Sequence, residues 1–184
     1  MCLYSLSDEY SVAEEDITVY KYVAKRYRVS EGRFTGATIT VQSYWGNREY
    51  YGDNPETVWK SPYNHKLEYP VGETVRDHAF QEHPWPGESM TEVTDITGNK
   101  DYAYRIEGGL HTFEDIEVAR GRAAGFKSID MENGVLECVI PKGTRYWKGW
   151  GRLCPEYCSE ALRVVRVVAE YNSLERLSGK DKKE

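Results

Sequence analysis

Two glycines before a histidine form the segment of this sequence that most resembles a ligand site. The segment reads Gly108-Gly109-Leu110-His111-Thr112-Phe113, and a helix is predicted to follow it. Free backbone N–H groups at the start of a helix can hold an anion, and His111 would stand beside that anion. The same glycines also suit a plain tight turn, so the pattern leaves both interpretations open.

A second candidate is the run Arg145-Tyr146-Trp147-Lys148-Gly149-Trp150, which mixes aromatic and basic side chains. Aromatic rings beside cations can stack on bases, so Tyr146, Trp147 and Trp150 are candidates for binding single-stranded nucleic acid. Such rings can equally cover the core at a sheet edge. The predicted ligand-binding residues of the whole chain are Tyr63, Gly108, Gly109, His111, Tyr146 and Trp147.

The motifs of the common catalytic and metal sites are missing from the sequence. There is no P-loop, G-x-G-x-x-G fingerprint, serine nucleophile elbow or H-E-x-x-H pair. Cys154 and Cys158 have a spacing found in zinc sites, but Cys2 and Cys138 are too far apart to supply the second short pair. We therefore predict no metal, no cofactor and no catalytic residue, which favours a protein that is not an enzyme.

Length and charge bound the remaining possibilities. The chain has 184 residues, which suits one domain over residues 1–178 with a disordered tail at 179–184. The net charge of -6 argues against a broad nucleic-acid surface, which needs a basic face. A local basic cluster is nevertheless present at Lys21, Lys25, Arg26 and Arg28. Because no signal peptide or membrane-spanning run is present in the sequence, we expect a cytoplasmic protein with reduced cysteines.

Alternation of apolar and polar residues predicts several strands. The first covers residues 16–29 and carries apolar groups on both faces, so we place it inside a sheet. A second strand, over residues 37–44, is expected to pair with it in antiparallel fashion. Residues 45–62 and 82–87 are predicted loops, and a strand at 161–169 is expected to precede a short helix that ends near residue 177.

One principal helix and one hairpin complete the prediction. The helix covers residues 113–124, with Thr112 as its N-cap and Gly125 as its stop. The hairpin joins residues 126–130 to residues 135–140 through a turn at Asn133-Gly134. The resulting class is α+β: a twisted, mostly antiparallel sheet with the principal helix packed on it.

The order of several short motifs resembles a family of small uncharacterised proteins of phages, prophages and gut bacteria. The motifs lie between residues 17 and 168, and they are Ser61-Pro62-Tyr63, Tyr69-Pro70-Val71-Gly72-Glu73-Thr74, Gly109-Leu110-His111-Thr112-Phe113, Cys138-Val139-Ile140-Pro141-Lys142-Gly143-Thr144-Arg145-Tyr146-Trp147 and Ser159-Glu160-Ala161-Leu162-Arg163-Val164. This resemblance implies no activity, since the shared residues look structural. It supports a strand over residues 162–169.

A fainter resemblance links the segment from Gly109 to Thr112, with Ala119 in the helix, to ADP-ribosyltransferases. It would imply a transferase that uses NAD or another nucleotide, with Glu137 as the candidate strand-borne carboxylate. The hypotheses are thus an accessory protein of viral or mobile-element type that binds a protein or small ligand, a nucleotide-using transferase, and a single-stranded nucleic-acid binder.

Overall fold

The structure, a computed structural model, describes residues 3–26, 38–43, 46–51, 58–62, 66–84, 91–94, 100–125, 131–150 and 155–172. Within these residues the strands and the helix are β1 (Leu3–Ser5), β2 (Ser11–Val12), β3 (Ile17–Arg26), β4 (Thr38–Ser43), β5 (Gly46–Tyr51), β6 (Thr74–Arg76), β7 (Thr91–Thr94), β8 (Lys100–Ile106), β9 (Leu110–Phe113), α1 (Ile116–Gly125), β10 (Met131–Ile140), β11 (Arg145–Trp150), β12 (Pro155–Ser159) and β13 (Ala161–Asn172). The predicted tail at 179–184 lies outside the described residues.

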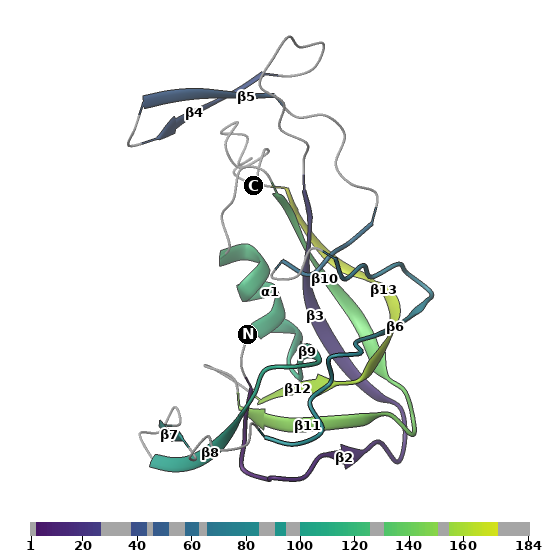
Figure 1. Ribbon diagram of the computed structural model, residues 1–184. Coiled ribbons are helices and arrows are strands. Elements are labelled where there is room, and N and C mark those ends of the chain that lie inside the picture. The colour runs from purple at the N-terminus through teal and green to yellow at the C-terminus, as the bar shows by residue number, and fades with distance from the viewer. Residues whose placement is uncertain are drawn as a thin grey trace.

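One large antiparallel sheet carries most of these strands. Its order is β6-β13-β10-β3-β9-β12-β11-β1-β8-β7, and β2 pairs with β11 beside this path. Strands β4 and β5 form a separate two-stranded sheet. Helix α1 lies along β3 and β10, as Figure 1 shows. The α+β prediction with a dominant antiparallel sheet and one helix is confirmed for the described residues.

Strand β3 lies inside the sheet, as its two apolar faces predicted, because β10 and β9 pair with it on either side. Val19 and Val23 point to a core face that also buries Leu136 of β10, and Tyr22 points to the opposite face. We call this opposite face the helix face, because Ala119 of α1 packs there. The predicted pairing of β3 with residues 38–43 is wrong, since that strand pairs with β5, in the segment predicted as a loop.

Helix α1 begins three residues later than predicted. Thr112 and Phe113 belong to β9 and are buried between neighbouring strands, so Thr112 is no helix cap. The cap is Asp115, whose Oδ1 accepts a hydrogen bond from the backbone N–H of Glu117 at 2.6 Å. The prediction failed here because burial of an apolar strand overrode the local capping pattern.

The predicted hairpin at Asn133-Gly134 is wrong. Strand β10 runs without a turn from Met131 to Ile140, and neither residue has a positive φ. Gly134 is needed for a different reason. A Cβ at this position would lie 2.7 Å from Cη2 of Trp59, so only glycine lets the indole ring pack against the strand. The first arm of the predicted hairpin, residues 126–130, lies outside the described residues.

The last described strand agrees with the prediction and extends it. Strand β13 pairs with β10 along most of its length, interrupted by two register shifts. It continues to Asn172, so residues 170–172 are strand rather than helix. The rest of the predicted terminal helix lies outside the described residues. Strand β10 ends before Pro141, as predicted, and Gly143 has a φ of 82° in the turn to β11.

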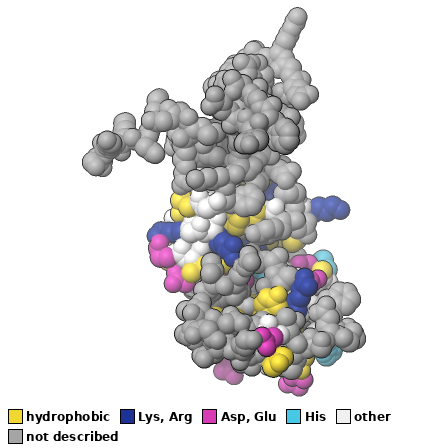
Figure 2. Space-filling view, turned by 90° about the vertical axis from the view of Figure 1, so that its left-hand side faces the viewer, with side chains coloured by type: hydrophobic (Ala, Val, Ile, Leu, Met, Phe, Trp, Pro, Cys, Tyr) yellow, Lys and Arg dark blue, Asp and Glu magenta, His cyan; other side chains and the backbone are white. Residues whose placement is uncertain are grey.

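The described surface mixes charges of both signs. In Figure 2, basic and acidic side chains are interspersed among apolar ones on the described part of the face shown. The only described helix, with ten residues, is too short and polar to cross a membrane.

The close packing of Trp59 on Gly134 predicts the effect of adding a side chain there. We expect Gly134→Val to lower the free energy of unfolding by about 2 kcal/mol, because the new methyl groups overlap the indole ring. Gly121→Ala is the control. The added Cβ would have no neighbour within 4 Å, and alanine stabilises a helix by about 0.5–1 kcal/mol relative to glycine. Urea unfolding of the three proteins measures both effects, and an unchanged stability for Gly134→Val would contradict the packing.

Candidate functional site

A buried lysine lies at the centre of the sheet. Lys21 is only 6% exposed and points to the core face between Val19 and Val23. Its Nζ donates a hydrogen bond of 2.6 Å to the backbone carbonyl of His111, and it lies 5.3 Å from the centre of the Tyr69 ring. Burial lowers the pKa of Lys21 to about 8.

This contact adds a second link between β3 and β9, which is otherwise paired along its length with β12. The ladder between β3 and β9 consists of the single pair Tyr20–Phe113. The carbonyl of His111 lies beyond that pair, and the ammonium group of Lys21 supplies a donor for it. Lys21 therefore ties the part of β9 that carries His111 to β3, while β12 pairs with it on the other side.

The ring of His111 is buried and neutral. Its Nε2 lies 3.0 Å from the carbonyl oxygen of Glu107, which can only accept, so Nε2 carries the proton. Burial, assisted by the charge of Lys21, lowers the pKa of His111 to about 4. The remaining ring atom, Nδ1, is then an acceptor, and it is buried without a partner.

Cys158 lies opposite His111 on β12 and gives the nearest approach to a catalytic pair. Its Sγ is 3.7 Å from Nε2 of His111 and donates to the carbonyl of Gly108 at 3.0 Å. An activated cysteine needs a lowered thiol pKa and a basic imidazole. Here burial raises the pKa of Cys158 and lowers that of His111. The pair therefore stays as neutral thiol and neutral ring, which does not suit nucleophilic catalysis.

Residues 77–84, which we call the strap, cross the sheet next to the two glycines. A Cβ on Gly108 would lie 2.1 Å from the carbonyl oxygen of Ala79, and one on Gly109 would lie 2.5 Å from Sγ of Cys158. Gly109 also has a φ of 122°, which other residues rarely adopt. The glycines thus admit the strap and the thiol to close contact with the start of β9.

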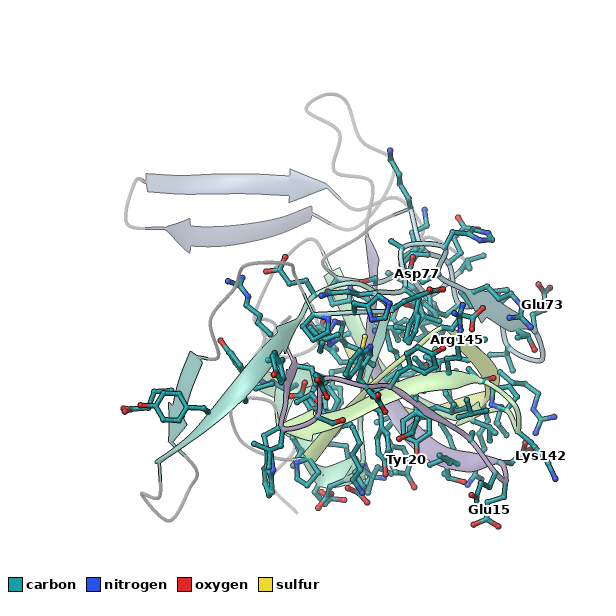
Figure 3. The ribbon with its side chains drawn as sticks, turned by 60° about the horizontal axis from the view of Figure 1, so that its bottom comes forward. Glu15, Tyr20, Glu73, Asp77, Lys142 and Arg145 are labelled. Carbon is teal, nitrogen blue, oxygen red and sulfur yellow. The ribbon has the colours of Figure 1, made fainter. Side chains whose placement is uncertain are left out.

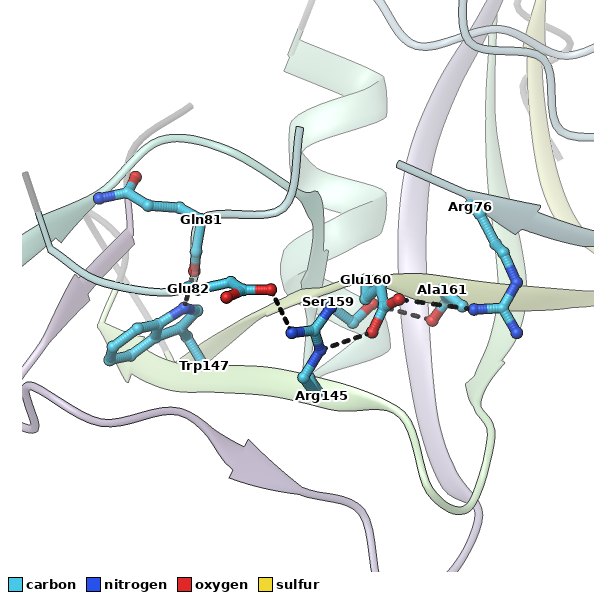
Figure 4. A network of polar contacts seen from close by, with 8 residues as sticks. All are labelled: Arg76, Gln81, Glu82, Arg145, Trp147, Ser159, Glu160 and Ala161. Atoms are coloured by element: carbon cyan, nitrogen blue, oxygen red, sulfur yellow. Dashed lines mark hydrogen bonds and ion pairs between the residues drawn. The ribbon is translucent and has the colours of Figure 1, made fainter. Parts of the chain in front are cut away.

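Ion pairs and hydrogen bonds fasten the strap to β11 and β12 (Figure 4). The guanidinium group of Arg145 donates to Glu160 at 2.9 Å and also pairs with Glu82 of the strap. Nε1 of Trp147 donates to the carbonyl of Gln81 at 2.7 Å. The backbone N–H of Asp77, which is labelled with Arg145 in Figure 3, donates to the carbonyl of Glu160 at 3.0 Å. The strap therefore covers this part of the sheet as a fixed element.

Four side chains, one each from the strap, β9, α1 and β12, have a buried polar atom without a partner. These atoms are Nε2 of Gln81, Nδ1 of His111, Oε2 of Glu156 and Nε of Arg122. We call the four side chains the polar seam. A fifth such atom is Oγ1 of Thr112. Thr112 is not counted in the seam, because it lies opposite Tyr157, whose side chain packs on the core face. Buried polar groups nearly always have partners, so this concentration marks the seam as unusual.

Register and hydrogen bonds connect the members of the seam. Glu156 lies opposite Phe113 on the helix face. The next pair on the same face, two residues along each strand, is Cys158 with His111. Gln81 and His111 both bind Glu107, the first through the backbone N–H and the second through the carbonyl. Burial raises the pKa of Glu156 to about 7, and the charge of Arg122 in α1 opposes that rise.

The residues predicted for ligand binding fall into separate places. Gly108, Gly109 and His111 lie together at the strap. Trp147 is 1% exposed and packs with Cys158, whereas Tyr146 alternates to the other face of β11, where its ring lies 5.7 Å from that of Tyr157. Tyr63 lies outside the described residues.

The aromatic and basic runs are likewise divided by the fold. Trp150 is 44% exposed, so it is available for stacking while Trp147 is not. In the basic cluster, Lys21 is buried and Nζ of Lys25 lies 3.9 Å from the centre of the Trp59 ring. Arg28 lies outside the described residues.

Glu137, the carboxylate considered for a transferase, lies opposite Tyr20 on the helix face and is engaged by Arg166 of β13. Its Oε2 accepts hydrogen bonds from Nε and Nη2 of Arg166 at 3.0 and 2.8 Å. Among the described residues, no three His, Cys, Asp or Glu side chains gather to hold a metal ion. Cys138 is buried, and Cys2 and Cys154 lie outside the described residues.

Sequence reasoning missed Lys21, Gln81, Arg122 and Glu156 as site residues. Only the burial of Lys21 could have been predicted. Lys21 lies between Val19 and Val23 on one face of a strand whose two faces are both apolar. Glu156 follows a proline in a short segment without a clear period, and Gln81 directly precedes the loop predicted at residues 82–87. Their burial arises from pairing between segments far apart in the chain.

Comparison with known proteins finds no family model, no curated protein and no solved structure that matches this chain. The resemblances to phage-type proteins and to ADP-ribosyltransferases remain predictions.

The hydrogen bond from His111 to Glu107 predicts one tautomer over a wide pH range. In histidine-labelled protein, ¹⁵N NMR should show His111 neutral, with its proton on Nε2, until the pH falls to about 4. His111→Gln assigns the resonance by removing it. A ring that is already protonated at pH 6, or that carries its proton on Nδ1, would contradict the described site.

Proposed function

We propose that this chain is a non-catalytic binding protein that holds a small polar ligand in the polar seam. The observation that carries the proposal is the presence of four unpartnered buried polar atoms on the strap, β9, α1 and β12. Leaving such a group unpaired costs roughly 1–3 kcal/mol, so a ligand that satisfies several of them gains binding energy without having to displace protein contacts.

The arrangement of the neighbouring groups favours binding over chemistry. The thiol of Cys158 and the ring of His111 are both held in their neutral forms by burial. Glu137, the carboxylate required by the transferase hypothesis, is bound to Arg166. A fixed strap and a neutral, oriented imidazole suit the recognition of a ligand through hydrogen bonds.

The biological role that we propose for this binding is based on the sequence alone. The order of motifs that resembles small phage and prophage proteins supports an accessory role in a virus or mobile element. Such a role is compatible with a ligand-binding protein and requires no reaction.

A fragment screen tests the proposal on the unmodified chain. Molecules of up to about ten heavy atoms are added to ¹⁵N-labelled protein, and amide shifts are followed in the two-dimensional spectrum. We expect saturable shifts that centre on Gln81, His111, Arg122 and Glu156. Trp150 serves as the remote reference, because it is exposed on the opposite face of β11. Hits that centre on Trp150, or no hits at all, would contradict a ligand site in the seam.

A further inference from the structure

The strap is less buried than the side chains that it covers. None of residues 77–84 is buried, and half of them are exposed. Phe80 of the strap packs against the cluster that contains Trp147 and Cys158, which are 1% and 0% exposed. A Cβ on Gly109 would meet both Sγ of Cys158, at 2.5 Å, and Cδ2 of Phe80, at 3.2 Å. The burial of Cys158 therefore depends in part on a segment that lies at the surface.

Few backbone hydrogen bonds join the strap to the other described residues. The N–H of Asp77 donates to the carbonyl of Glu160, one step beyond the ladder between β6 and β13. Further along, the N–H of Gln81 is 3.5 Å from the carbonyl oxygen of Gly108, and the Gln81 carbonyl accepts from the Trp147 side chain. Strand β12, by contrast, pairs with β11 on one side and with β9 on the other. A segment with exposed residues and little backbone pairing opens at a lower free-energy cost than the sheet unfolds.

Arg145 of β11 is the charged fastening of the strap (Figure 4). Its guanidinium group pairs with Glu82 of the strap and donates to Glu160, between β12 and β13, at 2.9 Å. The same group lies 5.4 Å from the centre of the Phe80 ring and 5.6 Å from that of the Tyr10 ring. One side chain of the sheet thus binds both the carboxylate and the aromatic ring with which the strap covers Cys158.

We propose that the strap is a gate that Arg145 holds shut: the segment after Asp77 leaves the sheet as a unit, while β9, β11 and β12 stay folded and the pair of Cys158 and His111 becomes exposed. The closed form is the one described, and the open form is a minor state reached against these fastenings. This inference goes beyond the proposed function, because it needs no ligand in the polar seam.

The gate has a chemical consequence for Cys158. Burial is the cause that raises the pKa of its thiol, and water that enters with the opening removes this cause. Because the thiolate is the reactive form, the gate decides whether Cys158 can react.

Thiol labelling measures the opening, because the chain has one buried cysteine beneath the strap and one away from it. Cys138 is 0% exposed in β10 and belongs to a different core cluster from Cys158. Folded protein is treated with iodoacetamide near pH 8, close to the ordinary pKa of a thiol. A bond forms between the sulfur and the carbon of the reagent, the carbon–iodine bond breaks, iodide leaves and the thiol proton passes to water. Mass spectrometry of the peptides then gives a separate rate for each cysteine.

In the wild type we expect Cys158 to react at least about tenfold faster than Cys138. The rate of Cys158 should barely change at low urea concentrations, because the opening exposes little surface, whereas the rate of Cys138 should rise with urea as global unfolding does.

Variants test the part played by Arg145. Arg145→Gln should raise the rate of Cys158 by about five- to tenfold without raising that of Cys138, since two ion pairs and two ring contacts are lost. Arg120→Gln is the matched control, because Arg120 donates to Glu117 at 2.7 Å in α1, away from the strap; both rates should equal those of the wild type. Glu82→Gln removes only the strap's own carboxylate and should raise the rate of Cys158 by about two- to threefold. This milder variant is decisive if Arg145→Gln does not fold.

Three results would overturn the gate. Equal rates for Cys158 and Cys138, with the same dependence on urea, would show that only global unfolding exposes the thiol. A Cys158 rate as fast as in urea-unfolded protein would show that the strap is not closed. If Arg145→Gln and Glu82→Gln change the rate no more than Arg120→Gln does, Arg145 does not hold the strap. The proposed function stands apart from all three, because the fragment screen tests it separately.

Discussion

The ammonium group of Lys21 holds together the two parts of the sheet that meet at β3 and β9. An ion inside a protein is costly unless it is paired or bonded, and Lys21 has the carbonyl of His111 and the face of the Tyr69 ring. The carbonyl in turn needs this donor, because the ladder between β3 and β9 holds only one residue pair. Removing the amine would leave a buried acceptor unpaired in the middle of the sheet.

The placement of the seam follows from that constraint. The backbone carbonyl of His111 accepts from Lys21, while its ring bonds to Glu107 and leaves Nδ1 buried without a partner. The strap is anchored independently by Arg145 and Trp147, and it meets β9 at the two glycines. Polar atoms that a packed core normally avoids are therefore enclosed between two fixed elements. Such an arrangement suits a protein that binds a small polar molecule rather than one that transforms it.

Strands with a clear alternation of apolar and polar residues could be predicted from the sequence. Segments whose conformation depends on contacts with distant parts of the chain could not. Strand β3 was predicted with its central position, because both of its faces are apolar. Asn133-Gly134 has the composition of a tight turn, but the ring of Trp59, from a distant segment, selects glycine in a straight strand. The diglycine and His111 were recognised as a candidate site. Gln81, Arg122 and Glu156 were not, because no local pattern encodes a burial that three separate segments create.

The pH dependence of stability tests the role of Lys21 most directly. Its pKa is about 8 in the folded protein and about 10.5 in the unfolded chain, so between these values the unfolded chain binds more protons and stability rises with pH. The free energy of unfolding of the wild type minus that of Lys21→Met should therefore increase by about 3 kcal/mol from pH 8 to pH 10.5. The difference cancels the contribution of Tyr69, whose raised pKa comes from burial and not from Lys21. A difference that does not change with pH would show that Lys21 is solvated in the native state, and would contradict the account.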